Sequence, residues 1–258
     1  THNDPQEGHP STVHITTDEG NVREFIHGSR ATNPVDQWPD PDVYVNYMGQ
    51  SLSGSENRNI NRTYPGKADG TLTEMMSYGI VQLINTENID VTVDLHEASP
   101  EYPVINALIA HERAMNLASN VVVDMQMEGV QISLEPSPTD LRGLTHRELG
   151  DHTDTLALLM EAPNPAQGRL RDRTDEALVL TGKSETYVKA GEIGQLYVPY
   201  DENGWPIEVR CARHVFGIER ILANYSEMYE EPIIVTGMPS YDELVKNGMG
   251  PYLNEPTT

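Results

Sequence analysis

VTVDLHEASPEYP (Val91–Pro103) is the most informative stretch of this 258-residue chain, because a strand signal runs directly into a histidine between acidic residues. Its β-branched start predicts a strand over residues 90–95, and Pro100 and Pro103 end any regular element. A strand can hold an imidazole rigidly while one face of the ring stays open to a ligand. His96 is therefore a candidate metal ligand. The alternative is a loop histidine with satisfied hydrogen bonds.

Strand and helix signals alternate on both sides of this stretch. Thr71 and Glu74 form a capping box that predicts a helix to about Asn85. Further elements are expected as a hairpin within 11–28, a helix at 104–128, strands at 130–135, 155–161 and 195–199, and a helix at 206–228. Residues 29–70 and the polar segment 136–154 are expected to be loops.

This alternation predicts an α/β fold, with a mixed, largely parallel sheet and helices on both faces. Residues 1–230 are expected to form one α/β domain, and residues 231–258 an extended C-terminal tail. In such sheets active sites gather at the carboxyl ends of the strands. His96 and Glu161 both fall at such ends.

The composition excludes several classes of partner. A formal net charge of −23 argues against nucleic acids and anionic membranes, which need a Lys/Arg surface. No apolar run is long enough to cross a bilayer. The single cysteine, Cys211, excludes an intrachain disulfide and a cysteine-rich zinc site, so a metal would need His, Asp or Glu ligands. The lack of disulfides favours the cytoplasm.

Glu161 is the second candidate, because it ends the apolar run TLALLME. Burial raises the pKa of a carboxyl group toward neutrality, which suits a general base that activates a metal-bound water. The alternative is a glutamate at the edge of the core that pairs with an arginine.

Two irregular segments offer groups that could bind a substrate. Asn61 and Arg62 are adjacent in RNINRTYPGK and can bind a carboxylate through an arginine fork and an amide donor, with Arg58 as a possible helper. Arg62 could equally brace an acidic side chain. In LRGLTHRELGDHTD, the titratable residues either form an internal salt-bridged loop or line a pocket: Arg142, His146, Arg147, Glu148, Asp151 and His152.

Three of these motifs, in this order, resemble the zinc carboxypeptidase superfamily, especially its succinylglutamate desuccinylase/aspartoacylase-like branch. They are Asn61-Arg62-Thr63-Tyr64-Pro65-Gly66, Asp94-Leu95-His96, and Leu158-Leu159-Met160-Glu161 followed by Asn164-Pro165. The resemblance spans roughly residues 40–165.

The resemblance implies a zinc-dependent hydrolase that cleaves an amide bond next to a carboxylate, as a carboxypeptidase or as a deacylase of N-acyl amino acids. His96 would be the third ligand of Zn²⁺, and Glu161 would be the base and later the proton donor. Asn61 and Arg62 would bind the substrate carboxylate, with Arg58 and His146 as further substrate-binding residues. The substrate would be a small peptide or an N-acyl amino acid.

One departure from the family pattern concerns the other two zinc ligands. The family carries them on a His-x-x-Glu motif upstream of Asn-Arg, and no such motif precedes Arg62 here. We therefore expect the motif and the first strands of the sheet on a segment before Thr1, supplied by a second polypeptide after processing. His2 is a substitute ligand in an alternative interpretation. Association with further copies of the chain stays open.

Two other functional classes compete with the hydrolase. A non-catalytic binding or assembly protein would keep the fold without a complete metal site, and the missing His-x-x-Glu motif favours it. Alternatively, Thr1 could act as an N-terminal nucleophile with its own amine as base, although no oxyanion donors are evident near it.

Overall fold

The computed structural model describes residues 13–16, 22–25, 40–171 and 176–253. The chain divides into two units, each assembled from separate stretches of sequence. The first contains residues 1–94, 110–114 and 136–159, and the second contains residues 95–109, 115–135 and 160–258. This division differs from the predicted boundary at residue 230, and Thr1 and His2 lie outside the described residues.

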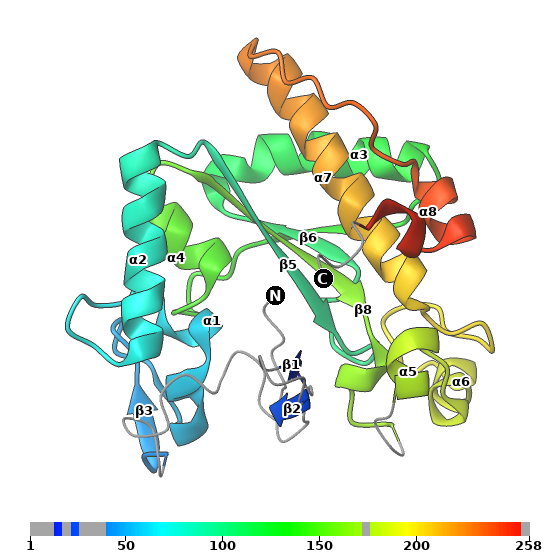
Figure 1. Ribbon diagram of the computed structural model, residues 1–258, viewed down its shortest axis with the longest axis horizontal. Helices are drawn as coiled ribbons and strands as arrows, with labels where there is room; N and C mark the ends of the chain where they lie inside the picture. Colours follow the sequence, from blue (N-terminus) through cyan, green and yellow to red (C-terminus); the bar gives the residue numbers. More distant parts are fainter. Residues whose placement is uncertain (1–12, 17–21, 26–39, 172–175, 254–258) are drawn as a thin grey trace. The chain divides into compact units, whose positions relative to one another are not determined.

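The main sheet has four strands in the order β5-β8-β6-β7 (Figure 1). The strands are β5 (Val91–Ala98), β6 (Ala107–Ala110), β7 (Ser133–Pro136) and β8 (Leu156–Pro163). In two pairs of strands, the residue numbers of both partners increase from one backbone hydrogen bond to the next. β5 is therefore parallel to β8, and β6 is parallel to β7. The end of β6 meets the start of β8, so this middle pair is antiparallel. The α/β class and the mixed sheet are confirmed.

In the first unit, β3 (Val43–Val45) and β4 (Ser51–Ser53) form a hairpin that precedes the short helix α1 (Ile60–Thr63). The helix α2 (Leu72–Glu87) begins with the predicted capping box, in which Thr71 and Glu74 each accept a hydrogen bond from the other's main chain. β1 (Val13–Thr16) and β2 (Val22–Phe25) pair antiparallel, as the predicted hairpin requires.

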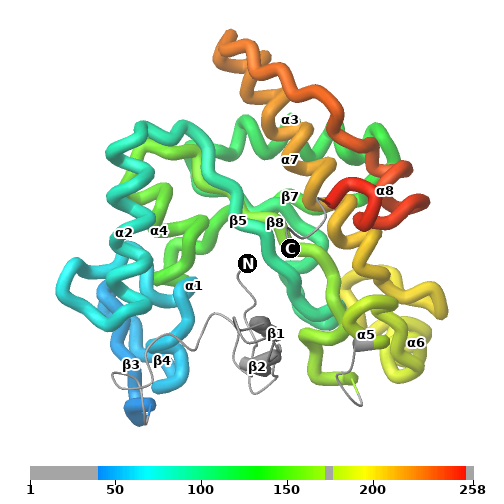
Figure 2. The backbone as a smooth tube through the Cα atoms, viewed as in Figure 1, coloured from blue at the N-terminus to red at the C-terminus, as the bar shows by residue number. Residues whose placement is uncertain are grey.

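In the second unit, α3 (Met115–Met127) and α7 (Ile207–Tyr229) lie side by side (Figure 1). They run antiparallel, because Asn120 contacts Met228 near the end of α7 while Glu128, just beyond α3, pairs with Arg220, about two turns earlier in α7. The chain then turns back and packs α8 (Tyr241–Asn247) against α7, as the orange-to-red tube in Figure 2 shows.

Each unit has an apolar core. In the first unit Tyr64, Val81, Ile84, Leu149 and Ala157 pack together, which joins α2 to the start of β8. In the second unit Ala98, Ile105 and Val198 pack with Trp205. The start of β8 and the end of β5 therefore lie in buried apolar surroundings. Burial of this kind stabilises them by about 25 cal/mol per Å² of apolar surface removed from water.

Several predicted elements were wrong. The helix expected at 104–128 begins only at Met115, because the fully buried run Ala107–Ala110 forms the inner strand β6. A short apolar run of this kind does not distinguish a buried strand from a helix. The strand expected at 90–95 continues to Ala98, so His96 lies within β5 and not beyond it.

The polar segment 136–154 is not a loop throughout, because it contains the helix α4 (Thr145–His152), which is mostly buried. No strand forms at 195–199; the elements nearby are the helices α5 (Glu176–Thr181) and α6 (Glu185–Glu192). The predicted helix at 206–228 is confirmed as α7. The C-terminal segment 231–258 is not simply an extended tail, since it contains α8.

Candidate functional site

His96 and Glu161 are direct neighbours on adjacent parallel strands. The main-chain oxygen of Asp90 accepts from Leu156 N at one end of the β5–β8 pair, and that of Ala98 accepts from Asn164 N at the other, both at 2.7 Å. Both strands advance by the same number of residues between these bonds, so the pair contains no bulge. This register places Glu161 beside His96 on the same face of the sheet.

The two side chains approach each other without a direct hydrogen bond. His96 Nδ1 lies 3.8 Å from Glu161 Oε1, beyond hydrogen-bond distance. Both side chains are largely withdrawn from solvent, with 7% and 14% of their surface exposed. The spacing and burial would suit a pair that shares a small group, such as a water molecule or a metal ion, between ring and carboxylate.

Glu97, the residue after His96, makes structural contacts. Glu97 accepts a hydrogen bond from Asn164 Nδ2 at 2.7 Å and forms an ion pair with Arg210 of α7. Arg210 is buried and also donates to the main-chain oxygens of Val179 and Trp205. These bonds tie the ends of β5 and β8 to α7 and fix the strand that carries His96.

His214 of α7 is a neighbour of the site that the sequence did not reveal. Its ring is hydrogen-bonded to the main chain of His96, and burial, aided by Arg213 and Arg210, lowers its pKa to about 4. The imidazole is therefore neutral near neutral pH. No local signal could have identified it, because RCARHVFG is an ordinary helical pattern.

Asn61 and Arg62 lie in the first unit, at α1. Asn61 is buried, and its side-chain oxygen accepts from the main-chain nitrogen of Thr145, the first residue of α4, at 2.8 Å. Arg62 Nη1 donates to the main-chain oxygen of Asn61 at 2.8 Å, and its Nε lies 3.8 Å from Glu56 Oε2. The Asn61 oxygen thus supports α4, and its amide nitrogen is the group left to meet a carboxylate.

Arg58 and His146 have structural partners. The guanidinium of Arg58 forms two bonds with the carboxylate of Asp40, at 2.7 and 2.6 Å. His146 is buried in α4, and its Nδ1 lies 2.8 Å from Ser137 Oγ. Their roles in substrate binding stay predictions.

The rest of the loop predicted from LRGLTHRELGDHTD forms an ion-pair network around α4, as one of the two sequence interpretations expects. Glu148, fully buried, accepts from Arg142 Nη2 and from Gly143 N at 2.8 and 2.9 Å. Two acids, Glu112 and Asp151, complete the network. Each lies next to both Arg147 and His111, with nitrogen-to-oxygen distances of 2.5 to 3.1 Å.

The network shifts the pKa values of its acids. The hydrogen bond from Arg147 holds the pKa of Glu112 at about 2, below its usual range. Burial raises the pKa of Asp151, but hydrogen bonds from His111 and Arg147 outweigh it and the pKa is lowered. Glu112 and Asp151 are therefore ionised at neutral pH and held within the network.

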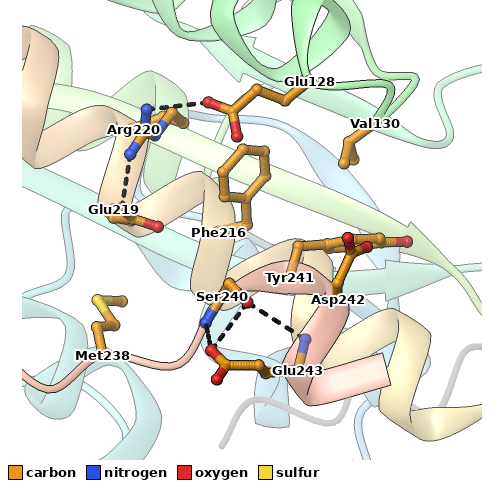
Figure 3. A pocket seen from close by; sticks show the side chains of 10 residues that line it. All are labelled: Glu128, Val130, Phe216, Glu219, Arg220, Met238, Ser240, Tyr241, Asp242 and Glu243. Atoms are coloured by element: carbon orange, nitrogen blue, oxygen red, sulfur yellow. Dashed lines mark hydrogen bonds and ion pairs between the residues drawn. The ribbon is translucent and has the colours of Figure 1, made fainter. Parts of the chain in front are cut away.

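A hollow of about 260 Å³ lies elsewhere in the second unit, between the end of α3, α7 and α8 (Figure 3). Its charged groups bind one another: Arg220 pairs with Glu128 and Glu219, and Glu243 caps α8 through Ser240. The Arg220 guanidinium also covers the Phe216 ring at 5.3 Å. The hollow contains none of the residues predicted for the site.

The described part of the chain consists of residues 40–171 and 176–253 and the two short strands before them. Within them, no group of three or more His, Cys, Asp or Glu side chains is arranged to hold a metal ion. Nor does any helix there have the length and apolar character needed to cross a membrane.

Comparison of the whole chain with protein-family models, curated proteins and solved structures finds no match.

Proposed function

We propose that this chain provides the general base and one metal ligand of a zinc-dependent hydrolase that cleaves an amide bond adjacent to a carboxylate. The observation that carries the proposal is the His96–Glu161 pair, in which a parallel register sets a buried imidazole beside a buried carboxylate with 3.8 Å between Nδ1 and Oε1. The reaction class is taken from the order of the three sequence motifs, which resembles that of the zinc carboxypeptidase superfamily.

The described residues do not complete a zinc site by themselves. A catalytic zinc normally has three protein ligands, and within the described residues His96 is the one assigned by the proposal. In the proposed enzyme the remaining ligands lie outside the described residues. Zinc, when bound, would acidify a water molecule and polarise the scissile carbonyl.

Glu161 has the position and surroundings of a general base. Its carboxylate can accept a proton from a water held between it and the His96 ring, and can return that proton to the leaving amine. His96 is kept in place by its strand, by the bonds of Glu97, and by the His214 ring on its main chain. A rigid pair of this kind needs little reorganisation during the reaction.

The carboxylate of the substrate is assigned to Asn61 and Arg62 by the resemblance. In the first unit the Asn61 amide is fixed through its oxygen, so its nitrogen is pre-oriented as a donor. An arginine beside it would add charge and a second donor. This assignment agrees with substrates that have a free carboxylate.

The test uses protein isolated from its native source, so that any second polypeptide is retained. Zinc is measured by elemental analysis, and hydrolysis is measured on a panel of N-acetyl amino acids and C-terminal dipeptides. Glu161→Gln should reduce kcat by about 10²- to 10⁴-fold without loss of zinc. Exposed Glu192→Gln is the matched control and should leave the rate unchanged.

Two results would reject the proposal. If the isolated protein contains zinc but hydrolyses none of these substrates, a binding or assembly role is the better explanation. If it hydrolyses them equally well with Gln at position 161, Glu161 is not the base.

A further inference from the structure

The hollow between the end of α3, α7 and α8 has the size of a site for a small molecule. Its volume of about 260 Å³ is just below the range of about 300 to 1,000 Å³ that is typical of sites for drug-sized ligands. Ten residues line it, and all of them belong to the second unit (Figure 3). His96 and Glu161 are not among them, so a function of the hollow is independent of the proposed hydrolase.

Two aromatic rings and the Met238 thioether form the apolar part of the lining. The centroids of the Phe216 and Tyr241 rings are 6.1 Å apart, and the rings are tilted by 55°. Phe216 is buried, and the Arg213 side chain is hydrogen-bonded to Tyr241, so both rings are held in place. Inclined aromatic rings of this kind present π-electron faces that attract cations.

The lining already binds one cation of the protein itself. The guanidinium carbon of Arg220 lies 5.3 Å from the centroid of the Phe216 ring. Its nitrogens lie 3.1 Å from the Glu128 carboxylate and 2.6 Å from that of Glu219. A ring face and two carboxylates around one delocalised cation show which chemistry this lining stabilises.

The carboxylates of the lining outnumber its basic groups. Four acidic residues and one arginine line the hollow: Glu128, Glu219, Asp242, Glu243 and Arg220. Arg220 pairs with two of the acids, and Glu243 caps α8. None of the ten lining residues binds the Asp242 carboxylate, which is exposed at the start of α8 (Figure 3). The charge of the lining therefore favours a positively charged ligand over an anion.

An inorganic metal ion is the less suitable ligand. Ca²⁺ and Mg²⁺ need several oxygen atoms that converge on one point at about 2.0 to 2.6 Å. Among the described residues, no group of three or more acidic side chains is arranged in this way. Carboxylates that are spread around aromatic rings suit an organic cation, whose charge is shared over several atoms.

We propose that this hollow binds a small molecule with an alkylammonium group, whose positive charge lies against the Tyr241 ring and the Asp242 carboxylate. The carbon chain of the ligand packs on Phe216 and Met238. A methylated ammonium is the most suitable headgroup, because it is weakly hydrated and its methyl groups contact the rings directly.

The test is an NMR titration of the 258-residue chain with choline at physiological salt. Salt screens the general attraction of a chain with a net charge of −23 for cations. Choline should bind at one saturable site with a Kd of about 1 mM or lower, and should shift the amide signals of Tyr241 and Asp242. The neutral isostere 3,3-dimethylbutan-1-ol, which has carbon in place of the ammonium nitrogen, should bind at least about 10-fold more weakly.

Variants identify the residues that bind the headgroup. Tyr241→Leu removes the ring and should raise the Kd for choline about 10-fold. Asp242→Asn removes an exposed charge and should raise the Kd about 3-fold, and it remains informative if the Tyr241 variant does not fold. Tyr197→Leu, at an exposed tyrosine outside the hollow, and Glu192→Gln, which changes the net charge equally, are the matched controls and should leave the Kd unchanged.

The other outcomes overturn the proposal. Equal affinity for choline and its neutral isostere would show that the hollow recognises an apolar shape and not a cation. Choline binding that Tyr241→Leu and Asp242→Asn leave unchanged would be a general attraction to an acidic surface. A titration without saturable shifts at Tyr241 and Asp242 would reject the hollow as a site for alkylammonium ligands.

Discussion

Two clusters of ionisable residues in this protein look alike in sequence and differ in structure. The α4 network of the first unit joins each acid to a cation by bonds of 2.5 to 3.2 Å. In the second unit, His96 and Glu161 are neighbours by register, yet their nearest ring and carboxylate atoms are 3.8 Å apart.

The difference separates a cluster whose acids are bound by arginines from the pair to which the proposed function assigns the chemistry. In the α4 network the acids accept hydrogen bonds from arginines, so their carboxylates are committed to partners. In the His96–Glu161 pair the nearest ring nitrogen and carboxylate oxygen are 3.8 Å apart, so the proposed function has one water molecule bonded to both. Substitutions should therefore change stability in the first cluster and activity in the second.

The largest effect on stability is expected for Glu148→Gln. It replaces a fully buried carboxylate that accepts from Arg142 and Gly143, after which Arg142 retains its ion pair with Asp151. Such a loss costs about 3 kcal/mol. Urea unfolding monitored by circular dichroism would measure it, with Glu192→Gln as an exposed control. A cost no larger than that of the control would contradict the structural role of the network.

Gly143→Ala should have the next largest effect. Gly143 has a φ of +88°, and a Cβ there would meet the main-chain oxygen of Arg62 at 2.3 Å. Backbone strain and overpacking together cost about 2 kcal/mol. Thermal unfolding gives the change. Gly194 has a φ of +70° with open space around an added Cβ, so Gly194→Ala introduces backbone strain without a clash. It should reduce stability less than Gly143→Ala does.

The loss of stability at acid pH should come from the α4 network of the first unit. A lowered pKa means that Glu112 stabilises the fold above about pH 4.5 and loses this contribution as pH falls toward 2. Because its side chain is largely exposed, the contribution stays below about 1 kcal/mol. Glu112→Gln should flatten the pH dependence of the unfolding free energy between pH 4.5 and 3. An unchanged slope would show that Arg147 does not shift this carboxyl.

Glu161→Gln should have the smallest effect on stability, below about 0.5 kcal/mol, because it keeps the shape of the side chain and the Glu161 carboxylate lies 3.8 Å from the His96 ring nitrogen. The same denaturation measurement as for Glu148→Gln makes the two clusters comparable. If Glu161→Gln costs as much as Glu148→Gln, the second cluster is structural too, and the comparison between them fails.

The sequence predicted the elements that local rules govern. Thr71 and Glu74 form the capping box at the start of α2, TLALLME forms β8, and the helix from about residue 206 is α7. Residues 107–110 were misassigned, since a short apolar run fits a buried strand as well as a helix, and only the neighbouring strands settle it. α4 was missed because its polar residues are buried in ion pairs, which a local pattern does not reveal.

For the candidate site, the sequence by itself determined the chemistry of the residues and their place at the ends of strands. His96 and Glu161 were identifiable because an imidazole and a carboxylate follow β-branched and apolar runs. Only the tertiary structure decided that these two residues are neighbours, that Arg58 and Glu148 are held by ion pairs, and that His214 contacts the His96 main chain. The reason is physical: strand register and side-chain pairing depend on contacts between residues far apart in the chain, which local propensity does not encode.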